Sequence, residues 1–106
     1  MMMKVNRRPT HPGIILRNHY LQPRSVSVAE LARATGLSRK HISAIVNGNT
    51  AITPESAVRI AKVLGTTPEL WLNLQNAVTL HDVCKKLRNW RPAAVHSAIA
   101  AAAAAE

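Results

Sequence analysis

The segment at residues 27–49, SVAELARATGLSRKHISAIVNGN, limits the possible folds more than any other part of the sequence. Apolar residues recur at helical spacing on both sides of a break at Gly36. A glycine at such a break indicates a helix end, because glycine adopts the left-handed backbone there without a steric penalty. The segment therefore predicts two short amphipathic helices joined by a tight turn, which is a helix-turn-helix. The expected core positions are Leu31, Ala32, Leu37, Ile42, Ile45 and Val46.

Local signals at the helix ends predict an all-α fold of five helices, the second and third of which form the helix-turn-helix. Ser27 and Glu30 form a capping box, in which each side chain satisfies a backbone N–H at the helix start. The tripeptide Thr-Pro-Glu, another start signal, occurs twice later in the chain. Pro92 must end or kink the last helix. The expected helices span residues 12–21, 28–35, 39–46 or 39–47, 54–64 and 68–90.

The 106 residues have room for one compact domain with short terminal parts. The sequence predicts a flexible basic arm at residues 1–10, a domain at 11–91 with a C-terminal dimerisation helix, and an Ala-rich tail at 92–106 without an assigned role. The tail is too short for a membrane span. The single cysteine, Cys84, excludes an intrachain disulfide and, with no secretory signal, predicts the cytoplasm. In the fourth helix, Val58 is expected to face the core beside Ala57, Ile60, Ala61 and Leu64.

The charge of the chain is strongly basic and unevenly distributed. Fourteen Lys and Arg residues against five Asp and Glu residues give a formal net charge of +9. Before Thr50 there are eight basic residues and a single acidic one, Glu30. Positive potential on the half that holds the helix-turn-helix favours a polyanionic partner such as double-stranded DNA, with a solvated basic surface as the alternative.

The outer face of the helix at 39–47 carries the candidate DNA-reading residues. In a helix-turn-helix the N-terminal part of the second helix enters the major groove. Arg39 and Lys40 are best placed to donate to guanine O6 and N7, while Ser43 and Ala44 offer a hydroxyl and a methyl that discriminate more weakly. Contacts to phosphates, which set register without reading sequence, are expected at Ser27, Ser38, Asn47 and Asn49.

A stripe of large apolar residues in the last helix predicts a homodimer. So small a domain cannot bury the whole stripe, and a second copy of the chain is the expected cover. Two recognition helices would then enter successive major grooves of a palindromic operator. The expected interface residues are Leu80, Val83, Leu87 and Trp90.

The sequence offers little material for catalysis or for a metal site. The five histidines are scattered, and the one metal-like spacing, from His81 to Cys84, supplies at most two ligands where structural zinc needs four. No Ser-His-acid arrangement, glycine-rich phosphate loop or pair of close carboxylates occurs. The chain is therefore predicted to be no enzyme and to use no metal or cofactor.

The run at residues 36–75, GLSRKHISAIVNGNTAITPESAVRIAKVLGTTPELWLNLQ, resembles the HigA-like, also called VapI-like, antitoxins of the XRE family. The resemblance implies the fold of the lambda-repressor DNA-binding domain. It also implies a dimer that binds an operator, represses its own operon and neutralises a RelE-like ribonuclease toxin. The positions that carry the resemblance are His11, Pro12, Gly13, Asn47, Gly48, Ile52, Thr53, Ala61, Gly65 and residues 71–75.

The chain departs from this family pattern at two places. Thr50 and Ala51 stand where many relatives have a basic residue, and Ala44 stands where a longer polar residue is common. Base reading is therefore expected to depend on Arg39 and Lys40. Three alternatives remain: a solitary XRE-type regulator without a toxin, a protein-interaction module that no longer binds an operator, and a DNA binder without sequence preference.

Overall fold

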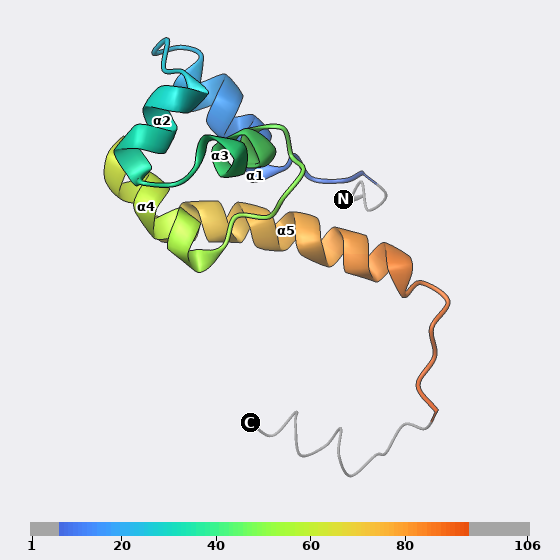
Figure 1. Ribbon diagram of the computed structural model, residues 1–106. Coiled ribbons are helices and arrows are strands. Elements are labelled where there is room, and N and C mark those ends of the chain that lie inside the picture. The colour runs from blue at the N-terminus through green and yellow to red at the C-terminus, as the bar shows by residue number, and fades with distance from the viewer. Residues whose placement is uncertain (1–6, 94–106) are drawn as a thin grey trace.

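The structure, a computed structural model, describes residues 7–93. These residues form several short helices packed against one long helix (Figure 1). These residues contain no strand. The predicted all-α fold, with a helix-turn-helix formed by α2 and α3, is confirmed. The elements are α1 (Pro12–Ile15), the π-helical η1 (Leu16–Leu21), α2 (Val28–Thr35), α3 (Arg39–Val46), α4 (Pro54–Leu64) and α5 (Pro68–Lys86).

The helix ends follow the predicted capping signals. Gly36 and Gly65 end α2 and α4 with left-handed backbones, at φ values of 76° and 75°. The predicted starts are confirmed as well, because at each of them a hydroxyl oxygen accepts a hydrogen bond from the backbone N–H three residues later. These hydroxyls belong to Ser27, Ser38, Thr53 and Thr67.

The first predicted helix, at residues 12–21, is only partly α-helical. After Ile15 it continues as a π-helix, in which the N–H of Gln22 donates to the carbonyl of Arg17. Leu16 and Leu21 are both buried in the core although they are five residues apart. An α-helix would turn side chains at this spacing to different sides, whereas the wider π-helix brings them closer to one face.

The last helix is shorter than predicted, because α5 ends at Lys86 and not at residue 90. From Asp82 to Ala93 every residue is exposed, so no packing supports further helical turns. Leu80 and Val83 lie on the helix, Leu87 is its C-cap, and Trp90 follows in the turn. The four apolar residues therefore do not form one continuous helical stripe.

The inward face of α4 differs from the prediction at one residue. Val58 is 41% exposed, which makes its expected core position wrong. Ser56 is buried instead, beside Ala57, and its Oγ lies 3.4 Å from His41 Nε2 of α3. A polar residue in the buried face interrupts the apolar pattern on which the prediction depended.

Trp71 of α5 lies at the centre of the aliphatic core. Its side chain is fully buried, and its Nε1 donates a hydrogen bond to Thr66 Oγ1 at 2.8 Å. The ring of Tyr20 packs edge-on against it, with 5.3 Å between ring centroids. The surrounding core residues are Leu16, Leu21, Leu31, Ala32, Ile42, Ile45, Val46, Ile52, Ala57, Ile60 and Ala61.

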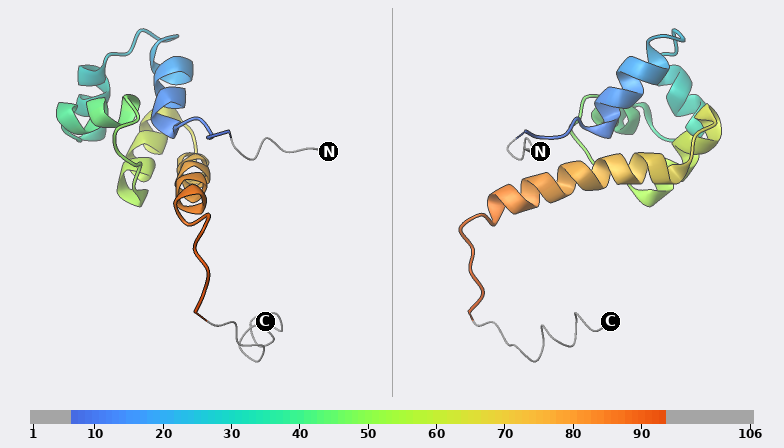
Figure 2. Two further views of the ribbon diagram at one scale, coloured as in Figure 1. Left: turned by 90° about the vertical axis from the view of Figure 1, so that its right-hand side faces the viewer. Right: turned by 180° about the vertical axis from the view of Figure 1, so that it is seen from behind.

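The helices are arranged as a compact unit at one end of a long helix. α1 to α4 cluster around the first half of α5, and the second half of α5 projects beyond them (Figures 1 and 2). The residues before α1 run back along the projecting half. This arrangement leaves one side of α3 and the far half of α5 accessible.

Candidate nucleic-acid interface

Helix α3 buries one face and presents the other to solvent. Ile42, Ile45 and Val46 are buried against the rest of the domain. Arg39 and Lys40 are exposed together in the first helical turn, and Ser43 and Ala44 are partly exposed farther along. The structure thus places the four predicted base-reading residues on accessible parts of one helix, and their contacts with bases remain a prediction.

The start of α3 leaves backbone donors available beside Arg39. Ser38 Oγ accepts a hydrogen bond from the N–H of His41 at 3.0 Å. The N–H groups of the first two residues, Arg39 and Lys40, have no acceptor within an α-helix. Together with the positive end of the helix dipole, they provide a local geometry suited to a phosphate, as predicted for Ser38.

The predicted phosphate contacts after α3 lie on an ordered turn. Asn47 is the C-cap of α3, and its Nδ2 donates to Ser43 Oγ at 3.4 Å. Gly48 has a φ of 74°, and the N–H of Asn49 donates a hydrogen bond to the carbonyl of Ala44 at 2.8 Å. The side chains of Asn47 and Asn49 are exposed beside the outer face of α3.

Ser27 is less suited to a phosphate contact than the other three residues. Its backbone N–H donates to Glu30 Oε1 at 2.8 Å, and its Oγ accepts from the N–H of Glu30 at 3.0 Å. The hydrogen bond from the Ser27 backbone N–H keeps the pKa of the Glu30 carboxyl below its ordinary value. A phosphate at this helix start would therefore meet an occupied amide and a carboxylate.

One residue from outside the helix-turn-helix, Gln75, contacts the loop after α3. Gln75 Oε1 accepts a hydrogen bond from the N–H of Ile52 at 2.9 Å, and Gln75 Nε2 donates to Thr79 Oγ1 at 3.3 Å. The sequence identified Gln75 as part of a recurrent run but assigned no role to it. The available signal was a glutamine one helical turn after Trp71, although neither its burial nor its partner could be read from the sequence.

Gly13 permits a close approach between α1 and α3. A Cβ at this position would lie 1.6 Å from the carbonyl oxygen of Ile45, so no side chain fits. His11 packs beside it and caps α1, since His11 Nδ1 accepts from the N–H of Gly13 at 2.9 Å. Burial lowers the pKa of His11, and a hydrogen bond with the Thr50 backbone opposes this effect.

Comparisons with known proteins agree with this geometry. A helix-turn-helix family model matches residues 19–71. An uncharacterised helix-turn-helix transcriptional regulator of Escherichia coli K12, YbaQ, is 44% identical over 87 residues, which cover 82% of this chain and 77% of the relative. Antitoxin HigA-1 of Vibrio cholerae is 41% identical over 81 residues, which cover 76% of each protein. The chain is a HigA-like member of the XRE helix-turn-helix family.

A solved structure extends the HigA-like resemblance to the whole helical domain. The Pseudomonas aeruginosa antitoxin HigA, solved with the higBA promoter, matches with a TM-score of 0.77 at 30% identity. The match covers 85% of this chain and 98% of that one. HigA-like proteins are regulators and antitoxins, so the prediction that the chain is no enzyme is confirmed by its family.

The end of the N-terminal arm is attached to α5 in this HigA-like chain. Arg8 Nε and Nη2 donate to the two carboxylate oxygens of Asp82 at 2.9 and 3.0 Å. These hydrogen bonds lower the pKa of the Asp82 carboxyl. Arg8 therefore contacts α5 through an ion pair whose two side chains are about half exposed. Arg7 is exposed as well. Residues 1–6 of the predicted arm and most of the tail lie outside the described residues.

The far half of α5 presents an apolar surface. The side chains of Leu80 and Val83 are 54% and 43% exposed, and Trp90 is 62% exposed. Leu87 is also exposed between them. Leu80 and Val83 lie on α5, whereas Leu87 and Trp90 follow its last residue. Large exposed apolar side chains are typical of interaction surfaces, and the role of these four in a dimer remains a prediction.

Other classes of site find no support among residues 7–93. In this part of the chain no three His, Cys, Asp or Glu side chains are grouped so that they could hold a metal ion. No helix among the same residues has the length and apolar character needed to cross a membrane.

Proposed function

We propose that the chain is a cytoplasmic antitoxin of a type II toxin-antitoxin module that binds its operator as a homodimer and represses its own operon. The observation that carries the proposal is the exposed basic first turn of α3, with Arg39 and Lys40, in a HigA-like helix-turn-helix. The P. aeruginosa HigA solved with its promoter supports DNA binding by this fold.

The residues of α3 divide into two proposed roles. Arg39 and Lys40 donate to guanine edges in the major groove, with Ser43 and Ala44 as weaker discriminators. Backbone donors at Ser38 and the side chains of Asn47 and Asn49 bind phosphates and thereby set the register. Ser27 is the least suited of the proposed phosphate contacts, because Glu30 occupies its amide.

The apolar surface on α5 supports the homodimer. Two copies that cover Leu80, Val83, Leu87 and Trp90 would remove these side chains from water and relate their recognition helices by a two-fold axis. Half-sites of a palindromic operator would then lie about 34 Å apart, or a multiple of this distance, which is one helical turn of DNA.

A RelE-like ribonuclease is the proposed toxin. The family resemblance supports this partner, as does the name of the V. cholerae relative, antitoxin HigA-1. The alternative is a solitary regulator, and the 44% identical YbaQ of E. coli, an uncharacterised helix-turn-helix transcriptional regulator, is compatible with either role. Co-expression of the chain with the protein encoded beside it distinguishes an antitoxin from a solitary regulator. An antitoxin must relieve the growth arrest that this neighbouring protein causes. A chain that binds its operator but gives no relief is a solitary regulator.

The DNA-reading role is tested with Lys40→Ala. Loss of a base contact is expected to weaken operator binding by about 1–3 kcal/mol and to relax preference at one position. Lys62→Ala, an exposed lysine on α4, removes the same charge away from α3 and is the matched control. Equal weakening on operator and random duplexes would indicate a DNA binder without sequence preference. A wild-type chain that binds neither duplex would indicate a protein-interaction module.

A further inference from the structure

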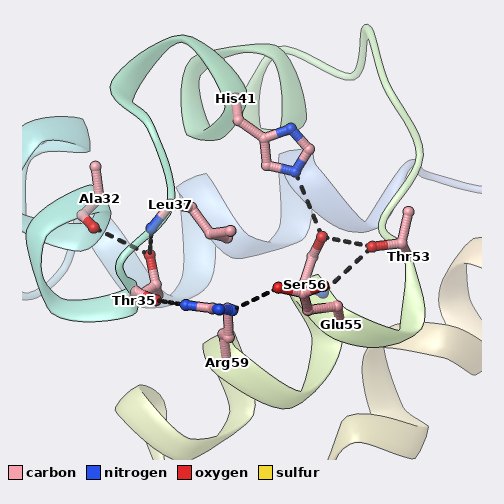
Figure 3. Close-up of polar contacts among 8 residues, drawn as sticks. All are labelled: Ala32, Thr35, Leu37, His41, Thr53, Glu55, Ser56 and Arg59. Atoms are coloured by element: carbon pink, nitrogen blue, oxygen red, sulfur yellow. Dashed lines mark hydrogen bonds and ion pairs between the residues drawn. The ribbon is translucent and has the colours of Figure 1, made fainter.

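Arg59 of α4 connects the scaffold of the domain to the turn of the helix-turn-helix. Its Nη1 donates a hydrogen bond to the backbone carbonyl of Thr35 at 2.8 Å (Figure 3). Thr35 is the last residue of α2, whose final carbonyls have no acceptor role within the helix. A guanidinium at this end also faces the negative pole of the helix dipole, which strengthens the contact.

The guanidinium of Arg59 is held in place from a second side. Its Nε donates to Glu55 Oε2 at 3.0 Å, one helical turn earlier on α4. Gly36 leaves the space that the guanidinium uses, because a Cβ there would lie 2.9 Å from Nη1. The hydrogen bond with Glu55 and the space left by Gly36 both favour the orientation of Arg59 toward the turn, in a pair whose side chains are 42% and 72% exposed.

The turn between α2 and α3 is short, and the side chain of Thr35 forms hydrogen bonds on both sides of it. Thr35 Oγ1 donates to the carbonyl of Leu31 at 2.8 Å and accepts from the N–H of Leu37 at 3.3 Å. Three residues then separate Thr35 from Arg39, the first residue of α3. Because the connection is so short, a displacement of the Thr35 carbonyl is expected to move the start of α3 and, with it, the proposed base-reading residues.

A second contact joins the first turn of α3 to α4. His41 Nε2 lies 3.4 Å from Ser56 Oγ, and Ser56 Oγ lies 2.8 Å from Thr53 Oγ1 (Figure 3). Ser56 is buried one turn before Arg59 on the same helix. Two side chains of α4 that are one turn apart therefore contact the neighbouring helices. Arg59 contacts the end of α2, and Ser56 contacts the first turn of α3.

We infer that Arg59 is a positioning residue for sequence reading, which sets the angle at which α3 presents Arg39 and Lys40 to the major groove. Base contacts need the reading side chains within about 0.5 Å of their productive positions, whereas phosphate contacts tolerate more displacement. Loss of Arg59 should therefore reduce discrimination between DNA sequences more than it reduces general affinity. The inference rests on the proposed operator binding.

The probe is a duplex selected by the wild-type chain from a random-sequence library, compared with a shuffled duplex of equal composition. Arg59→Met keeps the length of the side chain and removes its donors and charge. It is expected to weaken binding to the selected duplex about tenfold and to the shuffled duplex less than about twofold. Lys62→Met, the matched loss of charge on α4, should weaken binding to both duplexes equally.

The salt dependence separates positioning from a direct phosphate contact. The slope of log K against log salt concentration should be the same in Arg59→Met and in the wild type. A slope reduced by about one, with equal losses on both duplexes, would show that Arg59 binds a phosphate and would overturn the inference.

Arg59→Lys decides the question if Arg59→Met does not fold, as judged by its thermal melting. Lysine keeps the charge but lacks the planar group that contacts Glu55 and Thr35 together. A folded Arg59→Lys chain is expected to lose about threefold in discrimination. Full discrimination in this variant would show that the paired contact of the guanidinium with Glu55 and Thr35 is not needed for sequence reading, and would overturn the inference. A wild-type chain that selects no preferred duplex would contradict the proposed function instead.

Discussion

Gln75 accepts a hydrogen bond from the backbone N–H of Ile52, with 2.9 Å between Oε1 and the amide nitrogen. Both residues are buried, so the N–H of Ile52 has no access to water. The bond joins α5 to the loop that leaves the recognition helix. The position of Asn49 and the start of α4 therefore depend on a side chain from the last helix.

Replacement of Gln75 by Leu should destabilise the domain. The apolar side chain fills similar space but leaves the N–H of Ile52 buried without a partner, at a cost of about 1–3 kcal/mol. The free energy of unfolding in urea measures the effect. Asn76→Leu, at the exposed neighbouring position, should change the stability by less than about 0.5 kcal/mol. Equal effects of the two substitutions would show that the buried bond contributes nothing.

Gly13→Ala should be among the most damaging single substitutions in the chain. The added methyl group would lie 1.6 Å from the carbonyl oxygen of Ile45, so α1 and α3 must separate. We expect a loss of about 3 kcal/mol or more in the free energy of unfolding. Gly65→Ala is the comparison, because nothing lies within 4 Å and only its positive φ is strained. That variant should lose about 1–2 kcal/mol, and a larger loss than in Gly13→Ala would contradict the steric argument.

The stability should fall as the pH is lowered through the range in which histidines titrate. Burial lowers the pKa of His11 in the folded chain, so the unfolded chain binds this proton first, near pH 6.5. The free energy of unfolding is thus expected to decrease as the pH falls below about 6.5 and to level off below the folded-state pKa. The contribution of His11 is isolated by measuring the free energy of unfolding of the wild type and of His11→Asn between pH 8 and pH 5. Asparagine can still cap α1 but does not titrate, so two parallel curves would contradict the prediction.

Leu80→Glu should convert the proposed dimer into a monomer. Leu80 is 54% exposed, and a carboxylate at this position would have to be desolvated in the proposed interface. Light scattering after size-exclusion chromatography measures the mass directly. Ala34→Glu adds the same charge on α2, away from α5, and should leave the mass unchanged. A Leu80→Glu chain that remains dimeric would place the interface elsewhere.

The sequence by itself determined those features that depend on residues close together in the chain. The capping box of Ser27 and Glu30, the left-handed Gly36 and the limits of α2 and α4 are all as predicted. Each of these features involves contacts within about four residues, which the order of amino acids specifies directly. The apolar spacing of α3 likewise identified which of its faces is buried.

Only the tertiary structure decided the features that depend on partners far apart in the sequence. Gln75 meets Ile52 across 23 residues, and Arg59 meets Thr35 across 24. The end of α5 at Lys86 and the exposure of Val58 depend on where the neighbouring helices stop. Helical periodicity reports which face of a helix is apolar, but it does not report which surface that face meets or where support for the helix ends. Those outcomes follow from the packing of the whole domain, to which every helix contributes at once.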